Sequence, residues 1–423
     1  THVTYQVTGT PASPATGTIV VKGGITTVPG VVYLDDYFFV MDTNAIIYNC
    51  DLGDPTSWNA LNFITANVEP GSGVAIAKSR NYVVALKSWS TEYFYDAGNP
   101  TGSPLLPVIN GFSLIGCASG DSVANLDGML VWVSKTKQKG RSVHVADGLQ
   151  QEKVATPDVE RILNADTMQN VYAYGIKISG HTLYVLGLRD SNITLVYDLT
   201  TKTWTQWTSL TANTPVACSI AYADGYATVT KLAHGLDDGD PVTVSGATQS
   251  EYNGHFLALY VDENNFKIKI DGTPATPATG SPVITSYSET YFKCTKYVYC
   301  AGRDLVLHET TGELFEITDS VFDDSSNPIH FAAITGKVDG GNEDMKTNSQ
   351  IRVVGNKSGG NAAVRWSDND YATNSKFRIV DLDSEQARLT RCGKFRRRSF
   401  ELRHVGNNPI QLSSFEIDVR QEK

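Results

Sequence analysis

Apolar and polar residues alternate along most of the chain, in short runs separated by turn-forming residues. The clearest run is LVYDLTTKTWTQW, from Leu195 to Trp207, in which a strand ends at Asp198, a Thr-rich turn follows and a second strand begins. Alternation with a period of two predicts half-buried β-strands, and clusters of Gly, Asn, Asp and Ser predict the turns between them. The pattern therefore predicts an all-β protein.

The same strand-and-turn pattern recurs along the chain. Related stretches are Gly30–Leu61, Ser72–Pro100, Ala118–Gly148, Asn170–Trp207 and, in less regular form, Tyr291–Ile317. The first four begin about 40–50 residues apart, and such a period with several strands per repeat is typical of a β-propeller. One four-stranded sheet cannot bury both of its faces, whereas a ring of sheets can. The other interpretation of this periodicity is an ordinary β-sandwich.

Tryptophans stand near the ends of the repeats, and we expect Trp58, Trp204 and Trp207 to be structural blade aromatics. A large indole ring covers much apolar area and suits the seam between two blades. Replacing Trp204 with Ala should then cost about 3–5 kcal/mol if the ring is fully buried.

One segment interrupts the repeat and has strong strands of its own. We predict strands at Ala227–Thr230, Pro241–Ser245, His255–Val261 and Phe266–Ile270, followed by an exposed loop that begins at Gly272. The sequence thus predicts a β-propeller with a small inserted β-barrel or sandwich module and a β-rich C-terminal segment. The predicted boundaries are 1–212 for the first part of the propeller with about four blades, 213–288 for the inserted module, 289–345 for the continued propeller, and 346–423 for an Arg-rich segment that closes the propeller or forms a docking domain.

The charge balance excludes one class of function. The formal net charge is −10 and the sequence pI is near 5.3, whereas tight general binding of nucleic acid needs many Lys and Arg on phosphates. The balance is compatible with a protein that lets nucleic acid pass without gripping it. No run of 18 or more apolar residues occurs, so no membrane-spanning helix is predicted.

The cysteines and histidines do not predict a metal site, and we expect no cofactor. None of the six cysteines forms a Cys-x-x-Cys pair, so we predict mostly buried free thiols of a protein folded in a reducing cytoplasm. In AHGLDDGD, from Ala233 to Asp240, a His stands beside three carboxylates. A hairpin turn needs only Gly235 and Gly239 for positive φ and Asp for local hydrogen bonds, so we favour a turn over a metal site.

Two basic runs are candidate sites for DNA in a channel or for docking. Lys135, Lys137 and Lys139, followed by Arg141, alternate along a strand-like run, so the lysines should share one face. That face is either a solvated edge that guards against strand pairing or a strip that faces phosphates.

The second run is denser and lies near the end of the chain. Arg396, Arg397 and Arg398 lie within it, and Glu401 is its one acid. We expect Phe395 and Phe400 at core positions, with Arg396 and Arg398 on the opposite face. Such a face is either a docking surface for acidic neighbours or simply solvated.

No enzyme is expected. SDNDYATN, from Ser367 to Asn374, resembles the Ser-x-Asp-x-Gly-x-Thr-Trp turn of sialidase-like propellers, with Tyr371 in place of Gly and Asn374 in place of Trp. That turn is a structural device, and no spacing singles out the carboxyl pair that a glycosidase needs. The sequence contains no P-loop, Gly-x-Ser-x-Gly or His-Glu-x-x-His motif.

Taken in order, these segments resemble a known family, the packaged-DNA stabilisation proteins of short-tailed phages, which are tail hub or nozzle proteins. The resemblance is carried by Val31–Phe63, Val83–Pro100, Leu195–Trp207 and the ending VRWSDNDYATNSKF…RCGKFRRRSFEL. In addition, Ala227–Phe256 is similar to a small β module common in phage tail and baseplate proteins, although this insert is not universal in the hub family.

The resemblance implies a structural virion protein that is assembled in the host cytoplasm. It implies a homo-oligomeric, hexameric ring below the portal and adaptor, which extends the DNA ejection channel and helps retain packaged DNA. Implied partners are the adaptor, tail needle, spike or fibre proteins, and genomic DNA in transient contact, without membrane insertion. An acidic channel wall would repel phosphate and let DNA slide. The alternatives are a glycan-binding or glycan-cleaving tail propeller and a kelch-like interaction scaffold.

Overall fold

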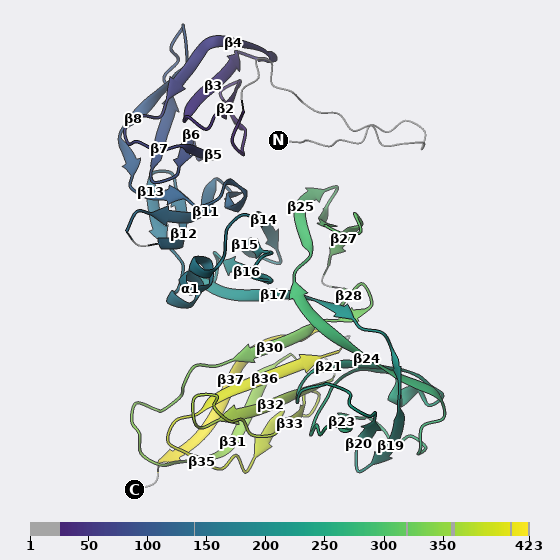
Figure 1. Cartoon of the computed structure of the whole chain (residues 1–423). Helices are drawn as coiled ribbons and strands as arrows, with labels where there is room; N and C mark the ends of the chain where they lie inside the picture. The colour runs from purple at the N-terminus through teal and green to yellow at the C-terminus, as the bar shows by residue number, and fades with distance from the viewer. Residues whose placement is uncertain (1–25, 139, 319, 357–359, 407, 422–423) are drawn as a thin grey trace, which may run out of the picture. The chain divides into compact units, whose positions relative to one another are not determined.

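The computed structural model describes residues 26–421, apart from 139, 319, 357–359 and 407. Its regular secondary structure is almost entirely β-strand, with a single α-helix among the described residues. It divides into two compact units (Figure 1). Unit 1 holds the residues up to Thr208 together with Tyr291–Ile317, and unit 2 holds Ser209–Thr290 and the residues from Thr318 onward. Two long strands, β17 (Thr203–Ala212) and β24 (Gly280–Tyr291), carry the chain across the boundary.

The described part of unit 1 contains five antiparallel sheets in which successive strands pair in chain order, except that β9 of the third sheet pairs with β11. The first sheet comprises β1 (Val32–Leu34), β2 (Tyr37–Met41), β3 (Ile46–Asp51) and β4 (Asp54–Thr65). The second comprises β5 (Gly73–Ser79), β6 (Tyr82–Lys87), β7 (Thr91–Asp96) and β8 (Leu105–Ser113). The third comprises β9 (Gly116–Cys117), β10 (Ala124–Leu126), β11 (Met129–Thr136), β12 (Gly140–Asp147) and β13 (Gln150–Lys153), with a 3₁₀ turn, η1 (Gly120–Ser122), between β9 and β10.

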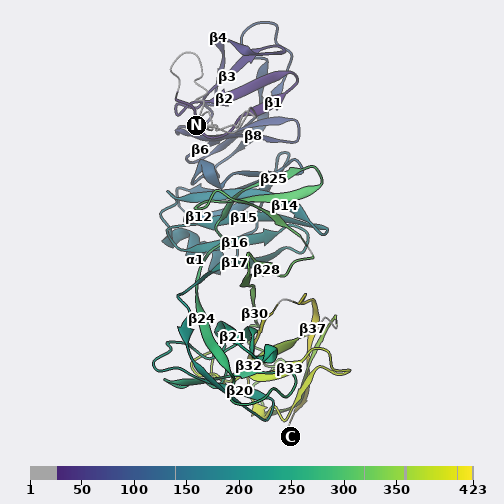
Figure 2. The same cartoon turned by 90° about the vertical axis from the view of Figure 1, so that its right-hand side faces the viewer.

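The last two sheets of unit 1 come from distant parts of the sequence. The fourth comprises β14 (Val171–Ile178), β15 (His181–Leu188), β16 (Ile193–Asp198) and the first part of β17. The fifth comprises β25 (Cys294–Cys300), β26 (Arg303–His308) and β27 (Leu314–Ile317). Figure 2 shows β14 to β17 in succession. The Leu195–Trp207 run is the end of β16, a turn and the start of β17, as its pattern predicts.

Two-residue turns with positive φ at both positions join several of these strands. Asp127 (φ 52°) and Gly128 (φ 84°) connect β10 to β11, and Ser179 (φ 49°) and Gly180 (φ 83°) connect β14 to β15. Both positive angles match the right-handed twist of the paired strands, which is why Asp-Gly and Ser-Gly mark hairpins. The predicted turn chemistry is confirmed at these positions.

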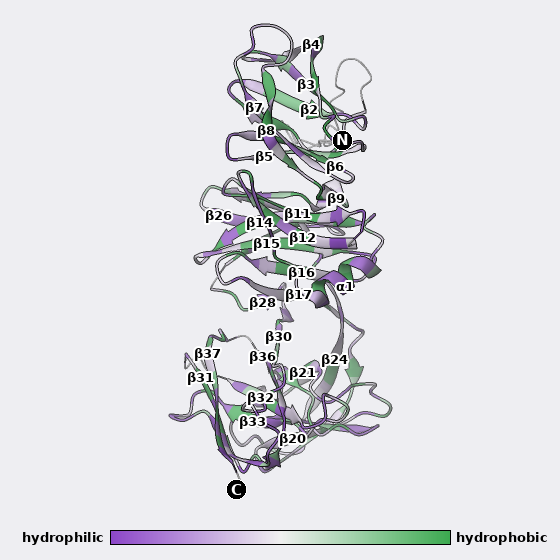
Figure 3. Ribbon diagram, turned by 90° about the vertical axis from the view of Figure 1, so that its left-hand side faces the viewer, coloured by the Kyte–Doolittle hydropathy of each residue, from purple (hydrophilic) through white to green (hydrophobic). Residues whose placement is uncertain are grey.

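Apolar side chains join each sheet of unit 1 to the next. Phe39 and Phe94 are buried together between the first and second sheets, and Trp132 lies between the second and third. Tyr184 belongs to the cluster between the third and fourth sheets, and Tyr297 packs in the one between the fourth and fifth. Figure 3 shows hydrophobic stretches along the strands, β2 among them. Sheets packed face to face in this way are the blades that the repeats predict.

The helix α1 (Pro157–Ala165) follows the third sheet and was not expected from the repeat pattern. The Thr156 side chain accepts a hydrogen bond from the Val159 backbone N–H, and Pro157 occupies the first turn. Both features favour a helix start. Val159 and Leu163, four residues apart, are buried in the cluster between the third and fourth sheets.

Unit 2 begins with a small β module that has its own apolar core. Its elements are β18 (Val216–Ala217), β19 (Ser219–Ala223), β20 (Tyr226–Thr230), β21 (Pro241–Ala247), η2 (Ser250–Tyr252), β22 (Gly254–Leu257), β23 (Asn265–Lys269) and β24. The strand predicted at His255–Val261 is shorter than expected, because β22 ends at Leu257. Tyr252, Phe266 and Ile268 are fully buried among the module's own residues.

The rest of unit 2 contains a two-sheet sandwich. One sheet contains β30 (His330–Ile334), β32 (Asn361–Ser367), β33 (Arg378–Asp381) and β36 (Ser399–Val405). The other contains β31 (Lys346–Gly355), β34 (Arg388–Thr390), β35 (Lys394–Phe395) and β37 (Leu412–Gln421). A short hairpin, β28 (Asp323–Asp324) and β29 (Asn327–Pro328), precedes them. Ile351 of one sheet and Phe400 of the other share the core between them.

The module and the sandwich are joined within unit 2. Leu259 of the module packs in one apolar cluster with Phe377 and Ala363 of the sandwich, all fully buried. The segment predicted as continued propeller, 289–345, is divided between the units, since Tyr291–Ile317 lies in unit 1 and the residues from Thr318 lie in unit 2.

Candidate docking and channel surfaces

The first predicted basic strip is not one strand face. Strand β11 ends at Thr136, so Lys135 lies on the strand and Lys137 lies in the turn that follows. The expectation that these lysines share a strand face is therefore wrong for Lys137, because the chain turns before it is reached. The expectation for Lys139 falls outside the described residues.

Lys135 and Arg141, at the two ends of this strip, both contact other residues of unit 1. The Lys135 Nζ lies 4.2 Å from the centroid of the Trp89 ring, close enough for a cation–π interaction. Arg141 donates to the backbone carbonyl of Leu163 at 2.9 Å and also to that of Asp166. Carbonyls at the C-terminal end of a helix carry partial negative charge, so Arg141 stabilises the end of α1. Lys137 remains an exposed member of the strip.

The three arginines of the second run have three different environments. Arg396 is exposed and donates from Nη1 to the Glu343 carbonyl at 2.9 Å. Arg397 is half-buried and pairs with the Asp370 carboxylate. Arg398 is 2% exposed. The expectation that Arg396 and Arg398 share an outer face is wrong for Arg398, because the segment between β35 and β36 turns its side chain into the sandwich.

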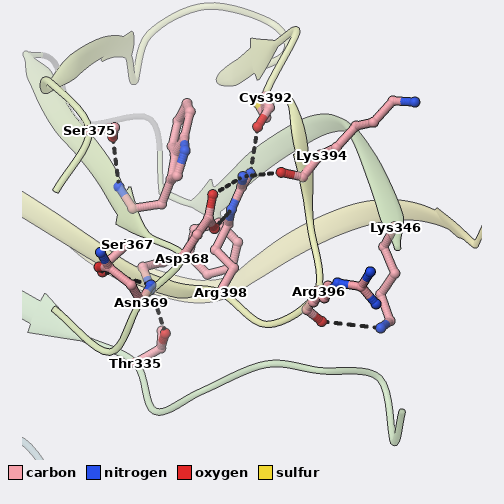
Figure 4. Close-up of polar contacts among 12 residues, drawn as sticks. Thr335, Lys346, Ser367, Asp368, Asn369, Ser375, Cys392, Lys394, Arg396 and Arg398 are labelled. Carbon is pink, nitrogen blue, oxygen red and sulfur yellow. Dashed lines mark hydrogen bonds and ion pairs between the residues drawn. The ribbon is translucent and has the colours of Figure 1, made fainter. Parts of the chain in front are cut away.

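Arg398 is held by a bidentate ion pair. Its Nε donates to Asp368 Oδ1 at 2.6 Å and its Nη2 to Asp368 Oδ2 at 2.9 Å (Figure 4). The guanidinium also donates to the Cys392 carbonyl and lies 4.6 Å from the Phe395 ring and 5.0 Å from the Trp366 ring. A planar guanidinium fits this combination of paired hydrogen bonds and ring stacking, which a lysine cannot reproduce.

Asp368 belongs to the turn that resembles the sialidase-like motif, and the turn is internally hydrogen-bonded. The Ser367 hydroxyl accepts from the Tyr371 backbone N–H at 2.9 Å, and Asn369 Oδ1 accepts from the Thr373 N–H at 2.9 Å. Because these groups and the Asp368 carboxylate are occupied in shaping and holding the turn, the motif acts as a structural clamp between β32 and β36.

Glu401 sits between two further arginines, a pairing that sequence reasoning missed. Arg365 Nε and Arg403 Nε each donate to a different Glu401 oxygen at 2.6 Å. Burial by itself raises the pKa of Glu401, but the hydrogen bonds and positive charges of the two arginines outweigh it, so the pKa lies below its ordinary value. Arg365 is 36 residues from Glu401 in sequence, so the run around Glu401 gave no local signal for it.

The Ala233–Asp240 segment forms the expected turn. His234 Nδ1 accepts from the Leu236 N–H at 3.0 Å, and Asp240 accepts from the Asp237 N–H at 2.8 Å. Asp238 accepts from the Tyr260 N–H at 3.0 Å. His234, Asp238 and Asp240 thus each accept a hydrogen bond from a backbone N–H group.

Among the residues that the structure describes, no three His, Cys, Asp or Glu side chains converge as metal ligands would. No helix there has the length and apolar character needed to cross a membrane. All six cysteines are free thiols; Cys50, Cys117, Cys294 and Cys392 are buried, while Cys300 is exposed.

The three candidate blade aromatics differ in position. Trp204 packs on the cluster between the third and fourth sheets, with its ring 5.0 Å from that of Tyr197 and its indole N–H donating to the Val154 carbonyl. Trp207 packs in the cluster between the fourth and fifth sheets, edge-on to Phe292 at 5.4 Å.

Trp58 is different from these two. It lies on β4 opposite Cys50, and its indole N–H donates to the Pro55 carbonyl at 2.8 Å. It is absent from the apolar cluster that joins the first and second sheets within the described residues. Trp58 therefore fills no seam between two described sheets.

The sequence of this chain matches the model of a phage stabilisation family, described as bacteriophage P22 Gp10, beta-propeller, over residues 1–231. That is more than half of the chain. The chain belongs to this family. Its description confirms the predicted β-propeller fold class, together with the five packed sheets of unit 1. The chain is thus a phage structural protein of the stabilisation type.

Comparisons with other proteins add nothing to this assignment. No curated protein matches the chain. Among solved structures, BamB from Moraxella catarrhalis is 14% identical, with 68% of this chain and 81% of that chain covered and a TM-score of 0.28. The WD40 domain of Toxoplasma gondii coronin is 10% identical, with 58% and 68% covered and a TM-score of 0.26. Similarities this low carry no argument about fold or function.

Proposed function

We propose that this chain is a subunit of a tail hub or nozzle, a ring below the portal and adaptor that extends the DNA ejection channel and helps to retain packaged DNA. The observation that carries the proposal is membership of the phage stabilisation family. The proposed ring is a homohexamer, its neighbours are the adaptor and a tail needle, spike or fibre protein, and its place is the virion. The proposed role is structural, without catalysis and without a cofactor.

The disposition of charge supports a wall along which DNA slides. The net charge is −10, and much of the dense Arg run is neutralised internally. Asp368, Asp370 and Glu401 bind arginines at close range. An arginine that is already paired with a carboxylate neutralises little phosphate charge and so displaces few of the counterions bound to DNA. Such arginines therefore add little to DNA affinity. Lys137 and Arg396, both exposed, remain the proposed contact residues for DNA or a neighbour.

The test is DNA retention by virus particles. Particles assembled without this chain should lose DNA, measured as nuclease-protected DNA per particle, and adding the purified chain before nuclease treatment should restore protection. Particles that keep a full complement of protected DNA without the chain would contradict the proposed function. In a second experiment, a chain that carries both Lys137→Glu and Arg396→Glu is added to the particles that lack the protein. We expect it to restore nuclease protection, because these residues are proposed to make only transient contact with DNA.

A further inference from the structure

A polar cavity lies within unit 2, where the small β module meets the sandwich. Its volume is about 430 Å³, which falls in the range of about 300–1,000 Å³ that small-molecule sites occupy. The module lines it with β22 and the end of β23, and the sandwich lines it with the start of β32, with β33 and with the end of β36. The two walls are joined, because Leu259 and Phe377 pack in one buried cluster and Arg403 donates to the Gly239 carbonyl at 3.0 Å.

His404 brings a buried polar atom without a partner to this cavity. The residue is 3% exposed and lines the cavity wall. Its Nδ1 lies 3.1 Å from the Asn361 carbonyl, whereas its Nε2 is buried without a hydrogen-bond partner among the described residues. Burial lowers the pKa of His404 and outweighs the opposite effect of the nearby Asn361 and Asn408 backbone, so the ring is neutral near pH 7. Because an unpaired buried polar atom is unfavourable, a ligand that pairs with Nε2 is favoured.

Glycines leave two rings of the cavity wall uncovered. A Cβ atom at position 406 would lie 3.7 Å from His404 Nε2, and one at position 254 would lie 3.6 Å from the Phe256 ring. Gly406 and Gly254 line the cavity together with these two rings. A larger side chain at either position would stand against the ring, so the glycines keep one polar atom and one apolar ring edge open to the cavity.

The charges around the cavity disfavour an anionic ligand. The Asp, Glu, Lys and Arg side chains among the described residues that line it are Glu251, Asp271 and Lys269. The Lys269 ammonium donates to the Ile270 carbonyl at 2.9 Å, so its charge is already engaged by the module. The exposed Asp271 carboxylate accepts from the Asn361 side-chain amide at 3.3 Å and keeps further acceptor capacity. Two carboxylates against one engaged ammonium repel a phosphate or another anion.

We propose that this cavity binds a neutral saccharide, whose hydroxyl groups pair with His404, Asp271 and Asn361. A hydroxyl donates to a carboxylate, accepts from an amide, and pairs with His404 Nε2 in either tautomer of the neutral ring. The apolar lining residues Phe256 and Ile379 suit the C–H groups of a sugar ring, whereas a wholly apolar ligand would leave the polar groups unpaired. The site belongs to unit 2 and does not depend on the proposed hub role.

The experiment is saturation-transfer NMR of the purified full chain, with glucose, galactose and N-acetylglucosamine as neutral probes and glucose 6-phosphate as an anionic probe. At least one neutral sugar should bind, and glucose 6-phosphate should not. Asp271→Ala should weaken binding of that sugar about tenfold or more, because it removes an acceptor from the cavity wall. Asp271 is exposed, so the substitution should leave folding intact. His404→Phe keeps an aromatic ring in the wall, removes both ring nitrogens and should weaken binding to a similar extent.

The matched control is Asp237→Ala, which removes an exposed carboxylate of the same module at a position that is not among the described lining residues. It should leave sugar binding unchanged. Thermal melts show whether each variant is folded, and if His404→Phe does not fold, Asp271→Ala decides. Three neutral sugars that all fail to bind, binding of glucose 6-phosphate alone, or equal affinity of the wild-type and Asp271→Ala chains would overturn the proposal. The hub role is decided separately, by DNA retention.

Discussion

Unit 1 and the C-terminal sandwich of unit 2 are both all-β, yet they are held together differently. Between the sheets of unit 1 most of the large buried groups are rings and aliphatic chains, such as the fully buried Trp132 and Tyr184, although β6 and β7 also bury the ion pair of Lys87 and Glu92. In the sandwich, Arg398 and Glu401 are buried as well, each with partners of opposite charge.

The difference teaches that a cationic run in a sequence is not necessarily a cationic surface. Apolar packing between blades needs volume and shape, and many side chains satisfy it. A bidentate arginine needs a carboxylate at one position and angle, so it fixes the loop between two strands.

The largest effect is expected at Trp132. Its side chain is fully buried between the second and third sheets, and its indole N–H donates to the Gly116 carbonyl at 3.1 Å. Trp132→Ala should lower the free energy of unfolding by about 3–5 kcal/mol, because it leaves a cavity and an unpaired carbonyl. Urea unfolding followed by circular dichroism measures this. An unchanged midpoint would show that the sheets do not pack through this residue.

The ionic counterpart is Arg398. Arg398→Gln should cost about 3 kcal/mol, the lower end of the range for breaking a buried pair, because the Asp368 side chain is 43% exposed. Exposed Arg396→Gln is the matched control and should be nearly neutral. The Arg398→Gln, Asp368→Asn double variant should cost less than the two single changes added together. If the loss in the double variant equalled the sum of the two single losses, the interaction between Arg398 and Asp368 would contribute nothing to stability.

A pH effect is expected from the third sheet. Burial and the nearby Lys153 charge lower the pKa of His144 to about 4 from an ordinary value of 6.5. Between these two pKa values, His144 is protonated in the unfolded chain but not in the folded chain. Its contribution therefore leaves the free energy of unfolding undiminished above pH 6.5 and lowers it as the pH drops toward 4. The loss should be roughly 2–3 kcal/mol. His144→Gln should flatten this slope, and an equally steep slope in the variant would assign it to other groups.

The smallest effects separate the blade tryptophans. Trp204 is only partly buried, so the full cost predicted for a completely buried ring does not apply, and Trp204→Ala should cost about 2 kcal/mol. Trp58→Ala, at a position outside the cluster between the first two sheets, should cost less than about 1 kcal/mol in the isolated chain. Thermal melts of the two variants compare them. Equal losses would mean that Trp58 also fills a seam.

The blades were predictable because their signals are local. Strand alternation and the Asp127-Gly128 and Ser179-Gly180 turns depend on residues within a few positions of each other, and the structure has both. The helix α1 also had a local signal, Thr156 and Pro157 ahead of apolar Val159 and Leu163, but it is short and lies among strand-like runs.

The buried arginine was not predictable in the same way. Arg398 and its partner Asp368 are 30 residues apart in sequence, and nothing near Arg398 indicates that its side chain turns inward. The outward aromatic positions of the first sheet have a local signal in the sequence. In Val31–Met41 and Ile46–Cys50, apolar residues occupy both alternating sets of positions, as expected of a strand buried on both faces.

The central claim is that this family member is a ring subunit on the tail axis. Cryo-electron microscopy of intact particles of the phage that encodes it tests this directly. The account predicts that density for the chain forms a six-fold ring around the DNA channel, below the adaptor. A position at the periphery of the tail, as a spike or fibre without a channel, would contradict it.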